Sequence, residues 1–254
     1  MTQSPLEPNL LHRIQELQQR CDQKQQIVHT DFLDAQTVAQ IQQYLSSHTF
    51  PAFHFSGGYP DAERQVLFFL PDWQDPADFQ PETFFTFLKL RPAAPQGLTH
   101  RDYLGSCMAL GIKREKMGDI LVLEDGAEFI VLPSIVPYLL SNVTRIGRTS
   151  TEIAEIPPAE LQLPVRQTIQ FTRTTASLRC DTLVSAAFSL SRSEAVAAIS
   201  KGLVAVNHLP EEKADRTLSL PCMLSVRGKG RVYLETEQNR SRKGRIFIHI
   251  TQEK

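Results

Sequence analysis

The spacing of apolar residues divides the first third of the chain into helices and then strands. A repeat of three to four residues predicts one helix over 10–21 and a second over 38–45, for which Asp34 is the candidate N-cap. Apolar runs at 50–55 and 64–70 predict two strands, joined through a glycine pair that permits a turn with positive φ. This segment is therefore expected to form a small α/β domain.

The middle of the chain predicts an alternation of strands and helices. The strands are expected at 83–90, 118–124, 128–134 and 144–156, and the helices at 99–112 and 133–143. An Asp-Gly turn joins the second and third strands into a hairpin. The resulting β-α-β-β-α-β order is the split βαβ arrangement shared by ferredoxin-like and RRM-type modules.

The last third predicts two short helices followed by strands. The helices are expected at 178–190 and 192–201, and the strands near 203–207, 222–227, 231–236 and 245–251. Proline-rich segments at 71–81 and 157–165 interrupt the pattern and favour domain boundaries. We therefore expect an α+β protein of three small domains, at 1–78, 80–158 and 173–254.

Charge is distributed unevenly along the chain. Residues 1–165 contain 12 basic and 20 acidic residues, a net charge of −8, whereas residues 166–254 contain 15 basic and 8 acidic residues, a net charge of +7. A basic C-terminal domain on an acidic body favours a polyanionic partner for that domain, although charge-biased segments also arise by chance.

Several classes of protein are excluded by composition. No apolar run reaches the roughly 20 residues that cross a bilayer, and the N-terminus lacks a secretory pattern, so we expect a cytoplasmic protein. Four scattered cysteines, without a C-x-x-C pair, predict buried thiols rather than a zinc site or a disulfide framework. The seven histidines show no metal-ligand spacing, and neither a metal nor another cofactor is expected.

The predicted helix at 192–201 carries its cations in unusual places. Ser191 and Glu194 form a capping-box pattern at its start, and Gly202 can end it in the left-handed conformation. Arg192 lies in the first turn, where the helix dipole disfavours positive charge, and Lys201 lies at the other end. Both cations fit an external phosphate. The alternative is a solvated Arg192 paired with Asp181 or Glu194, and the sequence leaves both interpretations open.

The same helix predicts which of its side chains are buried. Val196 and Ile199 are expected to face inward, while the small residues around them allow close helix packing.

The stretch at 177–208, SLRCDTLVSAAFSLSRSEAVAAISKGLVAVNH, strongly resembles the S4 RNA-binding domain. The matching positions are Arg179, Asp181, Ser191, Arg192, Gly202, Val204, Val206 and Asn207. Cys180 stands where that family usually has leucine. The segment LSVRGKGRVYL at 224–234 is similar to the closing strand and basic turn of the family.

The resemblance implies that the helix pair and the adjacent turn bind RNA through its phosphate backbone and shape. The candidate RNA-binding residues are Arg179, Ser191, Arg192, Ser193, Lys201, Asn207, His208, Arg227, Lys229 and Arg231. Asp181 is expected to orient an arginine rather than to contact RNA.

Secondary candidates lie outside this core set. The final predicted hairpin contributes Arg242, Lys243 and Arg245, for which a solvated turn is the alternative. In the central domain Arg145 and Arg148 are RNA-binding candidates, although an exposed strand end explains them almost as well. The aromatic run Phe84, Phe85 and Phe87 is interpreted as core rather than as a base-stacking platform.

The rest of the chain resembles the body of the YlmH-type S4-domain proteins, a family that includes members labelled photosystem II S4 domain proteins. The resemblance rests on HTDFLD at 29–34, SGGYPDAE at 56–63, LTHRDYLGSCMALGIKREKMGDILV at 98–122 and RIGR at 145–148. It implies an N-terminal α/β domain, a central RRM-like RNA-binding domain and an S4 domain. For the bacterial members it implies association with the ribosome and a role in rescuing obstructed large subunits that carry peptidyl-tRNA. The expected RNA partners are ribosomal RNA and tRNA, and we expect a monomer.

An enzymatic function is the alternative to this interpretation. S4 domains also accompany pseudouridine synthases and other RNA-modifying enzymes, but nucleotide-binding loops and synthetase signatures are absent from this sequence. We therefore expect a noncatalytic RNA-binding protein. The alternatives are an RNA-modifying enzyme targeted by its S4 domain and a factor for photosystem II assembly or translation.

Overall fold

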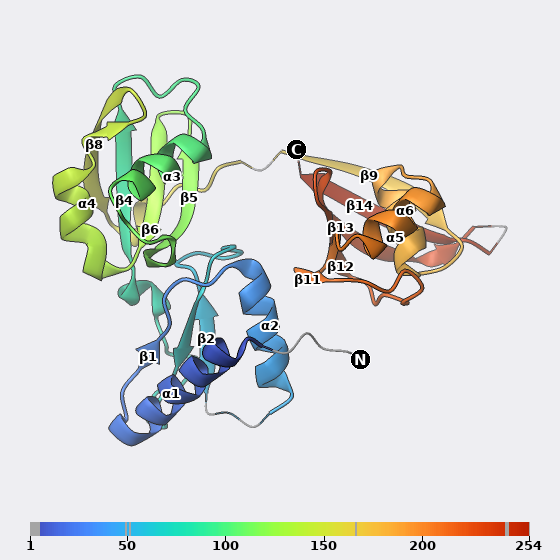
Figure 1. Ribbon diagram of the computed structural model, residues 1–254, viewed down its shortest axis with the longest axis horizontal. Coiled ribbons are helices and arrows are strands. Elements are labelled where there is room, and N and C mark those ends of the chain that lie inside the picture. Colours follow the sequence, from blue (N-terminus) through green and yellow to red (C-terminus); the bar gives the residue numbers. More distant parts are fainter. Residues whose placement is uncertain (1–5, 49, 51, 166, 242–243, 254) are drawn as a thin grey trace. The chain divides into compact units, whose positions relative to one another are not determined.

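The computed structural model describes residues 6–48, 50, 52–165, 167–241 and 244–253. The chain divides into two units, Met1–Pro164 and Val165–Lys254 (Figure 1). The first unit contains a three-stranded and a five-stranded sheet, and the second contains a six-stranded sheet. In the part of the chain that the structure describes, no helix is long and apolar enough to cross a membrane. The predicted α+β class is confirmed.

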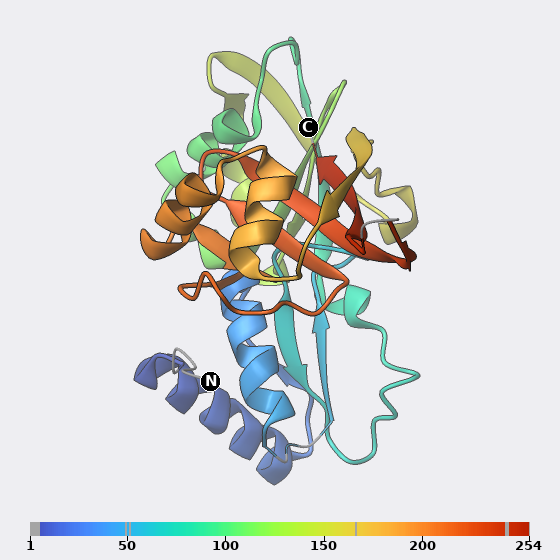
Figure 2. The ribbon, with the colours of Figure 1, turned by 90° about the vertical axis from the view of Figure 1, so that its right-hand side faces the viewer.

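Two helices and a small antiparallel sheet form the N-terminal part of the first unit. The elements are α1 (Pro8–Lys24), β1 (Val28–His29), α2 (Ala35–Ser46), β2 (Phe53–Ser56) and β3 (Val66–Phe69), with sheet order β1-β3-β2. Asp34 caps α2 as predicted, because its Oδ1 accepts a hydrogen bond from the Thr37 amide at 2.8 Å. Both helices lie on one face of this sheet (Figure 2), where Ile14 and Ile41 pack against Leu67.

The glycine pair between β2 and β3 serves two different needs. Gly58 has the expected positive φ of 93°. Gly57 does not, but a Cβ on it would collide with the Arg64 carbonyl and the Ala62 side chain, so the close approach of the chain requires glycine there.

The middle of the first unit has the predicted element order. It comprises η1 (Pro81–Phe84), β4 (Thr86–Pro92), α3 (His100–Ala109), η2 (Arg114–Lys116), β5 (Met117–Leu123), β6 (Gly126–Val131), η3 (Pro133–Ile135), α4 (Val136–Asn142), β7 (Arg145–Ile146), β8 (Thr149–Ile156) and η4 (Pro158–Glu160). The sheet order is β5-β6-β4-β8-β7, so β6 lies between the two strands that α3 connects. Tyr103 of α3 and Leu139 of α4 pack against Leu88 and Leu90 on the same face of this sheet.

The other face of the central sheet shares a hydrophobic core with the N-terminal sheet. Phe68 and Phe32 from the N-terminal part pack in one cluster with Phe85, Phe87 and Ile130 from the central part. Phe87 is 1% exposed and Phe85 is 6% exposed. The interpretation of this aromatic run as core is confirmed.

Polar contacts reinforce this junction. Asp119 of β5 accepts hydrogen bonds from the Tyr59 hydroxyl at 2.8 Å and from the backbone amides of Glu63 and Arg64 at 2.7 and 3.2 Å. The Arg64 guanidinium donates to the carbonyls of Met117 and Phe32, both at 3.1 Å. Sequence stretches that lie far apart along the chain are therefore joined at one junction.

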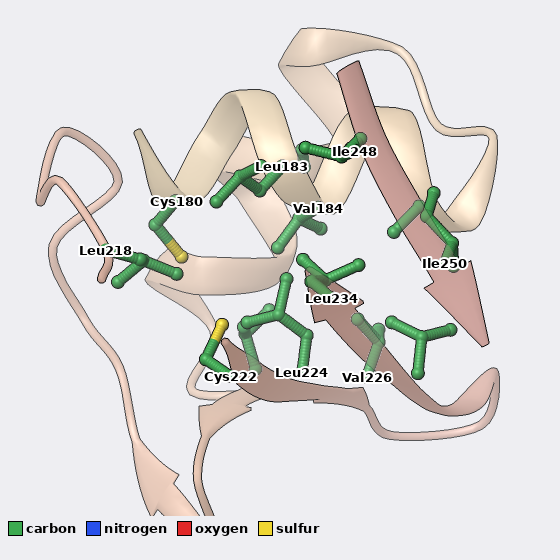
Figure 3. Packing of buried hydrophobic residues seen from close by; sticks show 14 of the residues in the cluster. Cys180, Leu183, Val184, Leu218, Cys222, Leu224, Val226, Leu234, Ile248 and Ile250 are labelled. Carbon is green, nitrogen blue, oxygen red and sulfur yellow. The ribbon is translucent and has the colours of Figure 1, made fainter. Parts of the chain in front are cut away.

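The second unit is a six-stranded antiparallel sheet with two helices on one face. Its elements are β9 (Thr168–Thr175), α5 (Cys180–Phe188), α6 (Arg192–Ser200), β10 (Val204–Val206), β11 (Leu209–Pro210), β12 (Cys222–Val226), β13 (Gly230–Arg240) and β14 (Ile246–Glu253), in the sheet order β11-β10-β12-β13-β14-β9. Side chains of α5, including Leu183 and Val184, pack over Leu224, Leu234 and Ile248 of the sheet (Figure 3).

Candidate RNA-binding site

Helix α6 begins and ends as its sequence predicts. The Glu194 amide donates to Ser191 Oγ at 3.2 Å, and the Ser191 amide donates to Glu194 Oε2 at 2.8 Å, which completes a capping box. At the other end Gly202 has φ 66°, and the amides of Gly202 and Leu203 donate to the carbonyls of Ile199 and Ala198. This is a Schellman motif, which fixes the position of Lys201 at the end of the helix.

The buried side of α6 differs from the prediction at one position. Ile199 is buried as expected, but the second inward residue is Ala195, whereas Val196 is 36% exposed. The prediction for Val196 is wrong because the side of α6 that packs on the core carries Ala195 and Ile199, four residues apart on one helix face. The exposed face between Arg192 and Lys201 consequently carries Ser193, Val196 and Ala197.

Asp181 is the buried centre of a three-residue ionic group. It lies in the first turn of α5 and is 1% exposed. Arg179 donates from Nε and Nη2 to its two carboxylate oxygens at 3.1 and 3.2 Å. Arg192, from the start of α6, donates from Nε to Oδ2 at 3.1 Å, and its Nη2 also lies 3.1 Å from Oδ2. Arg192 is therefore paired with Asp181, as one of the two interpretations of the sequence had it.

The pairing leaves the two arginines available to solvent. Their side chains are 39% exposed for Arg179 and 66% for Arg192. Burial of Asp181 works against ionisation, but hydrogen bonds from Arg179, Arg192 and Thr182 outweigh it and lower the pKa of the carboxyl to about 2. One carboxylate thus holds two guanidinium groups, and the group keeps a net positive charge at neutral pH. Arg179 and Arg192 can therefore pair with Asp181 and still bind a phosphate.

The turn between β12 and β13 lies beside α6. The Arg227 amide donates to the Leu203 carbonyl just beyond the end of the helix, at 2.9 Å. Hydrogen bonds from Ser191 lower the pKa of Glu194, and the charge of Lys229 adds to this effect. Lys201, Arg227 and Lys229 are exposed, and none forms an ion pair with an acidic side chain that the structure describes. The structure therefore brings these three cations to the side of the unit that carries α6.

Other sequence-predicted residues lie elsewhere or have structural contacts. Arg231 lies opposite Glu253 on the sheet, with an N–O distance of 3.5 Å. Because the neighbouring residue Val232 packs under the helices, Arg231 projects from the other face of the sheet. Ser193 is exposed at the start of α6, with its hydroxyl 3.1 Å from that of Ser191.

Asn207 and His208 form a tight turn between β10 and β11. Both have positive φ, 47° and 68°, as a type I′ hairpin turn requires. The Asn207 side chain accepts a hydrogen bond from the Met223 amide at 2.8 Å, and the Asn207 amide donates to the Met223 carbonyl at 2.9 Å. The side-chain oxygen Oδ1 of Asn207 therefore bonds this turn to β12.

The secondary candidates are divided between the two units. Arg145 and Arg148 lie in the first unit, in the β7–β8 turn. Arg245 precedes β14 and donates from Nη2 to the Thr174 carbonyl at 3.0 Å. Arg242 and Lys243 lie outside the described residues.

Two cations near Asp181 were missed by the sequence analysis. The loop before β12 packs against the start of α5, because the amides of Cys180 and Asp181 donate to the carbonyls of Arg216 and Ala214. This loop places Lys213 and Arg216 beside the ionic group, with Arg216 bound to the buried Glu211 at 2.6 Å. The mixed charges of EEKADR resemble an ordinary solvated loop, so no local pattern marked these residues.

Metal and thiol chemistry find no support at this site. Among the residues that the structure describes, no group of three or more histidine, cysteine, aspartate or glutamate side chains is arranged to hold a metal ion. Cys180 and Cys222 are buried in the core of the second unit (Figure 3). Burial raises the pKa of Cys180 to about 12 and that of Cys222 to about 11, so both remain protonated thiols at neutral pH.

Comparison with known proteins gives consistent matches. A family model described as "YlmH, N-terminal" matches residues 8–72, and one described as "Putative RNA-binding domain in YlmH" matches residues 91–160. The "Ribosome-associated protein quality control protein P2" of Bacillus subtilis (strain 168) is 29% identical over 231 residues, which are 89% of this chain and 87% of that protein.

A solved structure is also similar. The "Cell division protein ylmH from Streptococcus pneumoniae" superposes with a TM-score of 0.51 at 17% identity, over 60% of this chain and 92% of that one. At this identity the likeness concerns the fold alone.

Proposed function

Because this chain belongs to the YlmH family of RNA-binding proteins, we propose that it is a noncatalytic factor that binds RNA on the large ribosomal subunit in ribosome quality control. The Bacillus subtilis relative, whose name refers to that process, aligns along most of both chains. The Asp181 group is the observation that carries the proposal. Its two exposed arginines are held in fixed positions by a buried carboxylate, as phosphate binding requires.

The proposed binding surface lies on the second unit. Arg179 and Arg192 contact phosphates from the ionic group, and Lys201, Arg227 and Lys229 contact them from the end of α6 and the adjacent turn. The small side chains along α6 let an RNA backbone approach closely. Such contacts supply affinity and positioning rather than base recognition, and they make binding strongly salt-dependent.

The proposed organisation has three parts, with an N-terminal α/β domain at 1–78, an RRM-like domain at 80–158 and an S4 domain at 173–254. Each of the three parts contains one sheet, and the sheet of the last part also includes residues 168–172 at the start of β9. The proposed location is the cytoplasm, where ribosomes are found, and the proposed RNA partners are ribosomal RNA and tRNA.

Co-sedimentation with purified large ribosomal subunits tests the proposal. The full chain is expected to pellet with the subunits at low salt, and the variant Arg192→Glu plus Lys201→Glu is expected to remain in the supernatant. The matched control is Arg20→Glu plus Lys24→Glu, the same charge change at two exposed positions of α1. Equal sedimentation of the two variants and the unchanged chain would refute the proposal.

A further inference from the structure

The aromatic side chains of the central sheet are buried and are not available for stacking bases. The first face of this sheet is covered by α3 and α4. On its second face Phe87 and Ile130 pack so closely on Gly58 that a Cβ there would lie 3.1–3.2 Å from them. Glu128, fully buried on that same face, accepts a hydrogen bond from the Gln162 amide at 2.7 Å. Stacking of bases on these side chains is therefore blocked, whereas the outer side of α3 is exposed to solvent.

The outer side of α3 and the β7–β8 turn form one continuous surface. The Gly147 amide in this turn donates to Ser106 Oγ of α3 at 3.0 Å. Arg101 lies five positions before Ser106, about 7.5 Å along the helix axis. Arg101 and Gly105 are neighbours on the exposed side of α3, because residues four apart share a helix face.

Three exposed arginines give this surface its charge. Arg101 projects from α3 and Arg148 from the turn. Arg145 leaves β7 on the face opposite to Ile146, which packs under α3, and its side chain reaches the turn, where Nη2 donates to the Arg148 carbonyl at 2.7 Å. None of the three forms an ion pair with an acidic residue in the described ranges. The adjacent Asp102 carboxylate is occupied by the Thr99 amide and hydroxyl, both at 2.7 Å.

Two glycines leave the backbone between the arginines without side chains that would cover it. Gly105 and Gly147 are exposed, and a Cβ on either would have no atom within 4 Å. The arginine side chains therefore extend beyond an uncovered stretch of backbone. This shape suits a sugar-phosphate chain, which needs close approach as well as positive charge.

We propose that Arg101, Gly105, Arg145, Gly147 and Arg148, named here the α3–turn surface, form a second RNA-binding site that holds the phosphates of structured RNA. This inference deepens the proposed function and rests on it for the nature of the partner. It assigns the RNA contacts of the 91–160 region to the helix side, rather than to the sheet face that RRM modules use.

A binding assay with the full chain tests this site. It measures, by fluorescence anisotropy at several salt concentrations, the affinity for a short fluorescein-labelled RNA hairpin. The variant Arg101→Gln plus Arg148→Gln is expected to bind about tenfold more weakly at low salt. Its slope of log affinity against log salt should fall by about 1.5, since each phosphate contact contributes about 0.7–0.9. The matched control is Arg13→Gln plus Arg20→Gln, two exposed arginines of helix α1 in the same unit.

A second variant tests the site without removing an arginine. Gly105→Glu places a negative charge between the arginines, in open space on a helix, and is expected to weaken hairpin binding severalfold while circular dichroism is unchanged. If both variants bind like the control, or if the intact chain does not bind the hairpin, the α3–turn surface is refuted. If the unchanged chain does not sediment with large subunits, or sediments no more than Arg192→Glu plus Lys201→Glu, while hairpin binding still depends on the α3–turn surface, the proposed function is refuted and this site stands.

Discussion

Lys89 and Glu128 face each other across β4 and β6 with both side chains buried and an N–O distance of 3.5 Å. The Lys89 ammonium also reaches the more exposed Asp125 carboxylate at 3.0 Å. Glu128 Oε1 accepts no hydrogen bond from any residue that the structure describes. The charge of Glu128 therefore depends on Lys89 for compensation.

Because of this dependence, replacing Lys89 alone should cost more stability than replacing Lys89 and Glu128 together. Lys89→Met leaves a buried carboxylate without a counter-charge and should lower the free energy of unfolding by about 3–5 kcal/mol. The double variant Lys89→Met plus Glu128→Leu removes both charges and should recover most of that loss. Urea denaturation of the unchanged chain, the single variant and the double variant measures the two losses, and a double variant as unstable as Lys89→Met would contradict the prediction.

Asp181 predicts a loss of stability in acid. Its pKa is lowered from 3.8 to about 2 in the folded protein, so the unfolded chain binds the proton more readily. The stabilisation is complete above about pH 4 and is lost as the pH falls toward about 2, amounting to about 2 kcal/mol. Methyl NMR signals of Leu183 and Leu224, followed in urea at several pH values, report on this unit.

Asp181→Asn is the comparison for this pH dependence. Without an ionisable group at position 181, the stability of the second unit should decline less steeply over the same pH range. Parallel pH profiles for the two proteins would show that another carboxyl group is responsible.

The hydrogen bonds of Asp119 predict that replacing this residue destabilises both sheets of the first unit. Asp119→Ala removes the acceptor for three hydrogen bonds and should destabilise the unit by about 3 kcal/mol, whereas Tyr59→Phe removes one bond and should cost about 1 kcal/mol. Hydrogen exchange should accelerate together in β3 and β5. Acceleration in only one of these strands would show that the junction does not couple them.

Gly105 predicts a stabilising substitution. Gly105→Ala adds a methyl group in open space within α3 and should raise the free energy of unfolding by about 0.5–1 kcal/mol. Gly126→Ala is the contrasting variant, because Gly126 has φ 154° and its added Cβ would collide with the Leu90 carbonyl. Thermal unfolding should rank the three proteins in the order Gly105→Ala, unchanged chain, Gly126→Ala.

Local signals in the sequence predicted the ends of helices well. The capping residues bond to groups only a few positions away, so the short-range pattern contains the necessary information. These residues are Asp34, Ser191 with Glu194, and Gly202. Val196 shows where such reasoning is weak. A helix made mostly of small residues has no strong apolar stripe, and its buried side depends on what packs against it.

Long-range contacts account for what the sequence analysis missed. Strand β9 was not expected, because its pairing partner β14 lies about 70 residues further along the chain and nothing between them indicates the match. The shared core of Phe68 and Phe87 is equally invisible in composition, since the proline-rich segment between them looks like a linker. The positions of Lys213 and Arg216 likewise depend on how a loop folds back onto α5.

The place of β14 between β13 and β9 has a consequence for biosynthesis. Until residues 246–253 have been synthesised, the sheet of the second unit lacks the strand beside its edge, and β9 has no neighbour to pair with. The helices that carry the arginines of the Asp181 group pack on a core to which β14 contributes Ile248 and Ile250. A nascent copy of the chain therefore acquires the complete proposed RNA-binding surface only once residues 246–253 have been added.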